Sequence, residues 1–151
     1  TILEWNASLM AVAALLPAPA VATPENEERD VQLTATLNRL RLLSLRCRAA
    51  RRIDVFSACA LLAMDRVEAA QAFAEALLRA LPQATGKPSN FLFPGSRERS
   101  FDESWLLRLL EAVRHGDGDS TIFLIASQVR KPYRRQVAYL AKGLAEGLDT
   151  I

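Results

Sequence analysis

Hydrophobic positions recur along much of the chain every three or four residues, which is the spacing of an amphipathic α-helix. Together with capping residues at the segment ends, this spacing predicts seven helical segments. They cover about residues 2–16, 25–52, 55–64, 67–81, 101–114, 121–129 and 132–148. The long segment at 25–52 can equally be two helices joined end to end. The pattern therefore predicts an all-α protein, a compact bundle of six or seven helices.

Polar residues at the segment ends support these boundaries. Ser100 and Glu103 have the spacing of a capping box, in which each side chain accepts from the backbone N–H of the other residue. In "HGDGDS", which follows that helix, Gly116 suits the left-handed conformation that ends a helix. Asp119 or Ser120 can then cap the next helix.

The longest stretch without a helical signal covers about residues 82–100. We expect one long irregular loop there, after a helix that stops before Pro82. Phe91 and Phe93 lie in this loop and would face the same side of an extended chain. They either plug the loop onto the helical core or form a hydrophobic site for a partner.

The chain has the length of a single domain, and we expect one helical domain over residues 1–151. Within it we expect an apolar helix at 1–16, a Pro/Ala linker at 17–24 and the main bundle at 25–151. The apolar segment is too short to span a membrane, and no Lys or Arg precedes it as in a secretory signal. These features favour a cytoplasmic protein.

Charge and cysteine content exclude little by themselves. The net charge of +2 is too small to indicate nucleic-acid binding, so any basic function depends on local clustering. Cys47 and Cys59 are the two cysteines of the chain and do not form the framework of a disulfide-rich secreted domain. We expect both to be thiols on helices.

Local clustering is strongest in "RLRLLSLRCRAARR" (39–52), where six of fourteen residues are arginine and none is acidic. On one continuous helix, four of them fall on one outward face. That face suits solvent, phosphate groups or an acidic partner. The four residues are Arg41, Arg48, Arg51 and Arg52.

Arg39 and Arg46 belong to a second set on the same helix. Seven residues apart, they project among leucines, so we expect them to extend to solvent, pair with carboxylates or meet a partner. A break in the helix near Ser44 would remove this conflict by changing the phase of its second half.

A second basic cluster lies in "IASQVRKPYRRQVAYLAKGL" (125–144), which has the outline of a helix-turn-helix motif. Its basic residues are Arg130, Lys131, Arg134 and Arg135. The turn has no glycine, and the spacing is one residue longer than we expect for the motif. A packing hairpin with a basic, solvated corner is the other interpretation.

Motifs for catalysis are missing from the sequence. It has one histidine and no Gly-rich phosphate loop, Cys-x-x-Cys or Gly-x-Ser-x-Gly. We therefore expect no enzyme activity, no cofactor and no metal site.

Our leading hypothesis is a non-catalytic interaction or regulatory protein of bacterial origin. It would act through protein–protein contacts, with another protein or with itself as a homodimer. For self-association we expect the apolar first helix and the last helix to form the contact, because both are more apolar than a small bundle needs. The alternative is a DNA- or RNA-binding transcriptional regulator that uses the basic helices at 39–52 and 130–142.

Overall fold

A computed structural model of the chain describes residues 23–49 and 66–148. The chain divides after Val31 into two compact units, 1–31 and 32–151. In the first unit the described residues, 23–31, are all exposed. All further findings concern the second unit.

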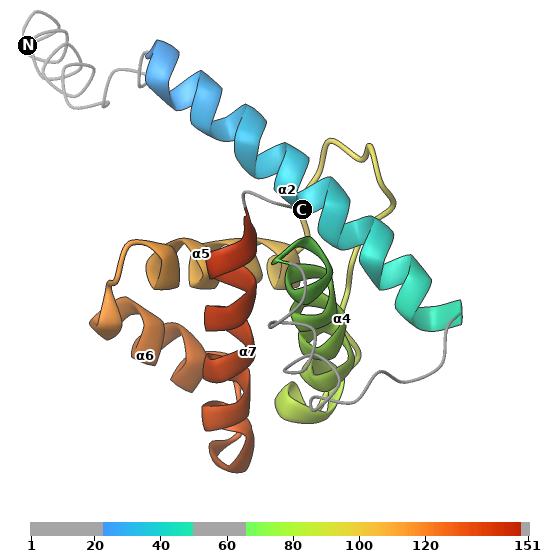
Figure 1. The fold of residues 1–151 in the computed structure, drawn as a ribbon, viewed down its shortest axis with the longest axis vertical. Helices are drawn as coiled ribbons and strands as arrows, with labels where there is room; N and C mark the ends of the chain where they lie inside the picture. The colour runs from blue at the N-terminus through green and yellow to red at the C-terminus, as the bar shows by residue number, and fades with distance from the viewer. Residues whose placement is uncertain (1–22, 50–65, 149–151) are drawn as a thin grey trace, which may run out of the picture. The chain divides into compact units, whose positions relative to one another are not determined.

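Helices account for all the regular structure among the described residues, which contain no strand. The described segments contain five α-helices and one 3₁₀ turn (Figure 1): α2 (Pro24–Ala49), α4 (Arg66–Thr85), α5 (Phe101–Arg114), α6 (Gly118–Gln128), η1 (Lys131–Tyr133) and α7 (Arg134–Gly147). The predicted all-α class is confirmed. The predicted count of six or seven helices is not, since the expected helices at 2–16 and 55–64 lie outside the described residues.

The core forms where α4 packs against α7, and α5 also packs against α7. Leucines of these helices, such as Leu77, Leu109 and Leu140, are completely buried. Phe73 on α4 packs edge-on against Tyr139 on α7, with ring centroids 5.9 Å apart. In α5, the Trp105 indole N–H also donates to the Leu124 carbonyl of α6, at 2.9 Å.

The end of α4 corrects one prediction. The helix does not stop before Pro82 but continues to Thr85, so the irregular loop begins at residue 86. Proline removes one backbone hydrogen bond, but Leu81 and Ala84 are buried in the core and hold this last turn in helical form. Gly86 then ends the helix in the left-handed conformation, with φ of +74°.

The predicted capping box is confirmed, because Ser100 and Glu103 each accept from the other's backbone N–H. Gly116 is left-handed, with φ of +69°, as expected. The predicted cap of the next helix is wrong. Asp117 accepts from the Ser120 N–H at 3.0 Å, so α6 begins at residue 118.

Gly143 marks the closest approach of α7 to α4. A Cβ atom there would lie only 2.6–2.7 Å from ring atoms of Phe73, which is 2% exposed.

We expect Gly143→Ala to lower the free energy of unfolding by about 1–3 kcal/mol, although alanine is the better helix former by about 1 kcal/mol. Urea denaturation measures this. Gly118→Ala is the matched control, because a Cβ at Gly118 meets nothing within 4 Å. Equal stability of the two variants would contradict the prediction.

Candidate interaction site

The most buried charged residues of the described chain are Arg41 on α2 and Glu103 on α5, at 1% and 0% exposure. The sequence prediction that Arg41 lies on an outward face is therefore wrong. Arg41 follows Leu37 by four residues and Leu40 by one, and all three share the core face of α2.

Arg39 and Arg46 are exposed, which agrees with extension to solvent, one of the three outcomes expected for them, but the side of α2 that they share is not the one that packs on the core. The reason is that leucines occupy positions 40, 42, 43 and 45, which point in most directions around the helix. The leucine pattern does not set the phase, and Leu42 is half exposed in the fold.

Every polar hydrogen of the Arg41 guanidinium has an acceptor. Nε donates to Glu103 Oε1 at 2.7 Å and Nη2 to Glu103 Oε2 at 2.9 Å, which is a bidentate pair. The remaining bonds go to Asn38 Oδ1, the Ser96 carbonyl and the Glu98 carbonyl, at 3.3, 2.9 and 2.6 Å. The bonds to Glu103 raise the pKa of Arg41 further, against the effect of burial.

Glu103 is equally saturated. Besides Arg41, its two oxygens accept from the backbone N–H groups of Leu92 and Ser100, at 2.7 and 2.9 Å. Burial opposes its charge, but the hydrogen bonds from Arg41, Ser100 and Leu92 outweigh it and lower the pKa of Glu103. The pair is therefore ionised at neutral pH and fully hydrogen-bonded, which a buried pair requires.

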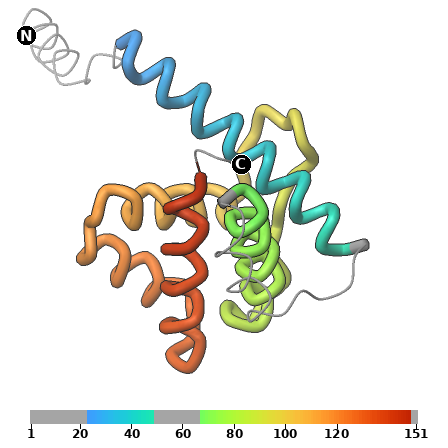
Figure 2. The backbone as a smooth tube through the Cα atoms, viewed as in Figure 1, coloured from blue at the N-terminus to red at the C-terminus, as the bar shows by residue number. Residues whose placement is uncertain are grey.

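These bonds order the irregular loop 86–100, which runs beside α2 (Figure 2). Arg41 and Glu103 together bond four of its backbone groups, at residues 92, 96, 98 and 100. Asn38 adds a bond from the Gly95 N–H at 3.0 Å, and Asp102 accepts from the Asn90 N–H at 2.8 Å. A loop of this length that is fixed at so many points is typical of a functional surface.

Phe93 begins a tight turn at the tip of this loop. The Ser96 N–H donates to the Phe93 carbonyl at 3.1 Å, Pro94 follows, and Gly95 has φ of +84°. This is a type II turn. The Phe93 side chain is 76% exposed, the highest value among the large hydrophobic residues described.

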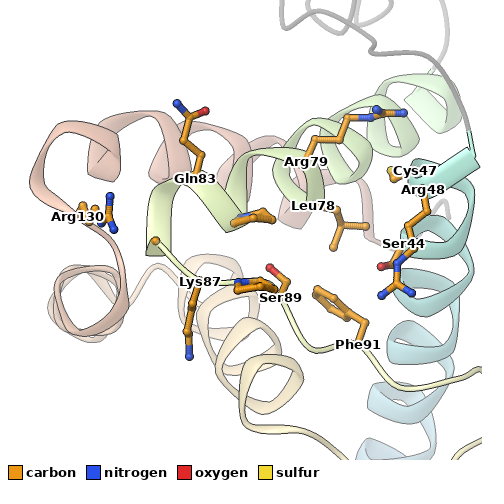
Figure 3. A pocket seen from close by; sticks show the side chains of 13 residues that line it. Ser44, Cys47, Arg48, Leu78, Arg79, Gln83, Lys87, Ser89, Phe91 and Arg130 are labelled. Carbon is orange, nitrogen blue, oxygen red and sulfur yellow. The ribbon is translucent and has the colours of Figure 1, made fainter.

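Phe91 has a different position from Phe93. It is partly buried against the core, so the two aromatic residues do not form one hydrophobic face. Phe91 also lines a pocket of about 680 Å³ between α2, α4 and the loop (Figure 3). Of the two interpretations of these residues, packing onto the core applies to Phe91 and exposure to Phe93.

One residue from each of the two basic clusters of the sequence lines the pocket. Arg48 from α2 and Arg130 from the segment before η1 both line it, together with Arg79 and Lys87, and none of the described lining residues is acidic. The sequence patterns gave no signal for Arg79 and Lys87, because nothing in their spacing relates them to the other arginines. The backbone N–H of Arg130 bonds the Ala84 carbonyl at 2.9 Å and fixes the chain there.

The other predicted contact residues lie elsewhere. Lys131 and Arg135 are exposed and do not line the pocket. Arg51 and Arg52 lie outside the described residues. Arg134 folds back on α6, where it donates to the Val129 and Ala126 carbonyls at 3.0 and 3.3 Å. It therefore caps the carboxyl end of α6.

Cys47 also lines the pocket and is a free, half-buried thiol, while Cys59 lies outside the described residues. Burial and the nearby charge of Glu75 raise the pKa of Cys47, against the opposing effect of Arg79. A thiol with a raised pKa is protonated at neutral pH and is a poor nucleophile.

Within residues 23–49 and 66–148, no group of three or more His, Cys, Asp or Glu side chains is placed to hold a metal ion. No helix of these segments has both the length and the hydrophobicity needed to cross a membrane. Comparison of the chain with models of protein families, with curated proteins and with solved structures finds no match.

Removing one member of the buried pair should strongly lower the free energy of unfolding. In Glu103→Gln an amide N–H₂ replaces an oxygen that accepts from Arg41, so donors face each other. We expect a loss of about 3–5 kcal/mol in the free energy of unfolding. Lys87→Gln is the control, because it breaks the more exposed Lys87–Asp102 pair (3.2 Å) and should cost at most about 1 kcal/mol. Similar losses in urea denaturation would contradict the assigned role of Glu103.

The same pair predicts acid sensitivity. The pKa of Glu103 is lower in the folded chain than its ordinary value of 4.5. The contribution of ionised Glu103 to the free energy of unfolding is therefore complete above pH 4.5 and is lost as the pH falls through the pKa of the folded chain. Urea midpoints of the wild-type chain should fall steadily below about pH 4.5, and those of Glu103→Gln should fall less. Parallel pH profiles would show that other carboxyl groups cause the acid sensitivity.

Proposed function

We propose that this chain is a non-catalytic interaction domain that binds a partner protein through the turn at Phe93. The observation that carries the proposal is an exposed phenylalanine on a turn whose backbone is bonded to the buried Arg41 and to Asn38. A single exposed apolar residue is ordinary on a protein surface. An exposed phenylalanine is less ordinary where the backbone of its turn is hydrogen-bonded to a buried ion pair, as it is here.

Rigid aromatic side chains make effective contact anchors. Burying a phenylalanine removes a large apolar area from water, and little entropy is lost when its backbone is already ordered. Anchors of this kind contribute most of the binding energy in many interfaces. Phe93 meets both conditions, because it is exposed and its turn is fastened to α2.

The charged residues of the loop support a proposal about the chemistry of the partner. The loop carries three basic residues, Lys87, Arg97 and Arg99, and one acidic residue, Glu98. We therefore propose a partner with an apolar recess for Phe93 and acidic groups around it.

Homodimerisation is a second form of this proposal. The fold reduces the number of surfaces that could form the contact between the two copies. The apolar face of α7, a candidate surface for self-association, is used inside the fold, where Val137, Leu140 and Leu144 are completely buried. The other candidate, the N-terminal apolar segment, lies outside the described residues.

Nucleic-acid binding remains the alternative proposal, supported by one observation. Arg135, Gln136, Tyr139 and Lys142 are exposed along α7, as a recognition helix requires. The role of Arg134 as a cap of α6 and the burial of Arg41 remove two of the basic residues that this function was expected to use.

Phe93→Ala tests the main proposal. A photo-crosslinking amino acid at position 93, introduced in the cells that make the protein, first identifies the partner. With that purified partner, we expect Phe93→Ala to weaken binding about thirtyfold, the effect of losing an anchor worth about 2 kcal/mol. Its stability should change by less than about 0.5 kcal/mol, because the side chain is exposed.

Phe123→Ala is the matched control, since Phe123 is 72% exposed but lies on α6. It should leave the affinity unchanged. Equal losses in both variants, or a loss only in Phe123→Ala, would overturn the assignment to the loop. Crosslinking of position 93 to the chain itself would identify a homodimer. Crosslinking only to DNA or RNA, with salt-dependent binding that Arg135→Gln weakens, would replace the proposal with the alternative.

A further inference from the structure

The pocket between α2, α4 and the loop is separate from the proposed partner contact, because Phe93 does not line it. Its volume of about 680 Å³ is in the range of small-molecule sites. All four charged residues that line it are basic, and they come from four separate segments of the chain. These residues are Arg48, Arg79, Lys87 and Arg130.

An apolar surface lies between these charges. Leu78 and Pro82 contribute from α4, and Pro88 and Phe91 contribute from the loop. Figure 3 shows Phe91 beside Leu78, with Arg48 and Arg130 on opposite sides of the pocket. Apolar walls with a few polar groups are typical of sites that bind a ligand with a ring-sized apolar body.

Arg48 and Arg130 are the cations best placed for a ligand. The Lys87 ammonium already pairs with Asp102 at 3.2 Å and lies 5.3 Å from the centre of the Phe101 ring. The guanidinium of Arg130 lies against Gly86, in space that the Cβ of any other residue would occupy. Glycine at this position thus permits both the left-handed end of α4 and the placement of Arg130 in the pocket.

Ser44, Ser89 and Gln83 add hydroxyl and amide groups to the lining. Guanidinium groups bind phosphate and carboxylate oxygens with charge-assisted hydrogen bonds, and none of the described residues that line the pocket beside Arg48 and Arg130 carries a carboxylate. We infer that the pocket binds a small amphipathic anion, with a phosphate or carboxylate group held by Arg48 or Arg130 and an apolar body against Leu78 and Phe91.

Phenyl phosphate is a suitable probe, because it combines both features. We expect it to shift the backbone amide NMR signals of Ser44, Ser89 and Phe91 in the full chain, in a saturable way. Inorganic phosphate and benzyl alcohol each carry one feature and should bind about tenfold more weakly. Benzoate tests whether the site prefers a phosphate or a carboxylate group, and binding of either anion supports the inference.

Of Arg48→Gln and Arg130→Gln, the variant that removes the arginine holding the anionic group should weaken phenyl phosphate binding about tenfold, the effect of one charge-assisted hydrogen bond, and no weakening in either variant would overturn the inference. Arg39→Gln is the matched control on α2, because Arg39 is exposed and does not line the pocket. Equal weakening by Arg39→Gln, or no saturable shift at millimolar probe, would overturn the inference. Phe93→Ala should leave probe binding unchanged, so that failure of the partner contact and failure of the pocket are distinguishable.

Discussion

The ion pair between Arg41 and Glu103 is the interaction on which the rest of the surface depends. Two charges are completely buried, and the fold meets this cost by giving every donor of the guanidinium and both carboxylate oxygens a partner. Several of those partners are backbone groups of the loop 86–100. The pair therefore connects α2 with the loop and with α5, which follows the loop directly, although α2 lies far from both in the sequence.

Order in this loop creates the two surface features on which the proposed binding depends. One end of it, with Lys87 and Phe91, forms a wall of the basic pocket. Further along, the turn at Phe93 exposes an aromatic side chain. A mobile loop would lose entropy on binding at either place, whereas this one is already held in position. The proposed binding thus depends on the same hydrogen bonds that stabilise the loop.

The basic residues have three different roles, which their charge alone does not distinguish. Arg41 is structural and inaccessible, and Arg134 caps α6. Arg48 and Arg130 line opposite sides of one pocket, although they are far apart in the sequence. This distribution favours binding of a compact anion over a continuous phosphate-binding face, which needs its cations side by side on one surface.

The sequence by itself determined the helical class, five of the helical segments, the capping box at Ser100 and the left-handed Gly116, because each depends on residues within one or two turns of each other. It did not determine the end of α4, where burial of Ala84 outweighs the effect of Pro82. Nor did it determine the phase of α2, since leucines surround that helix. Only the tertiary structure decided that Arg41 is buried, because its partner lies 62 residues away and no local pattern specifies such a distance.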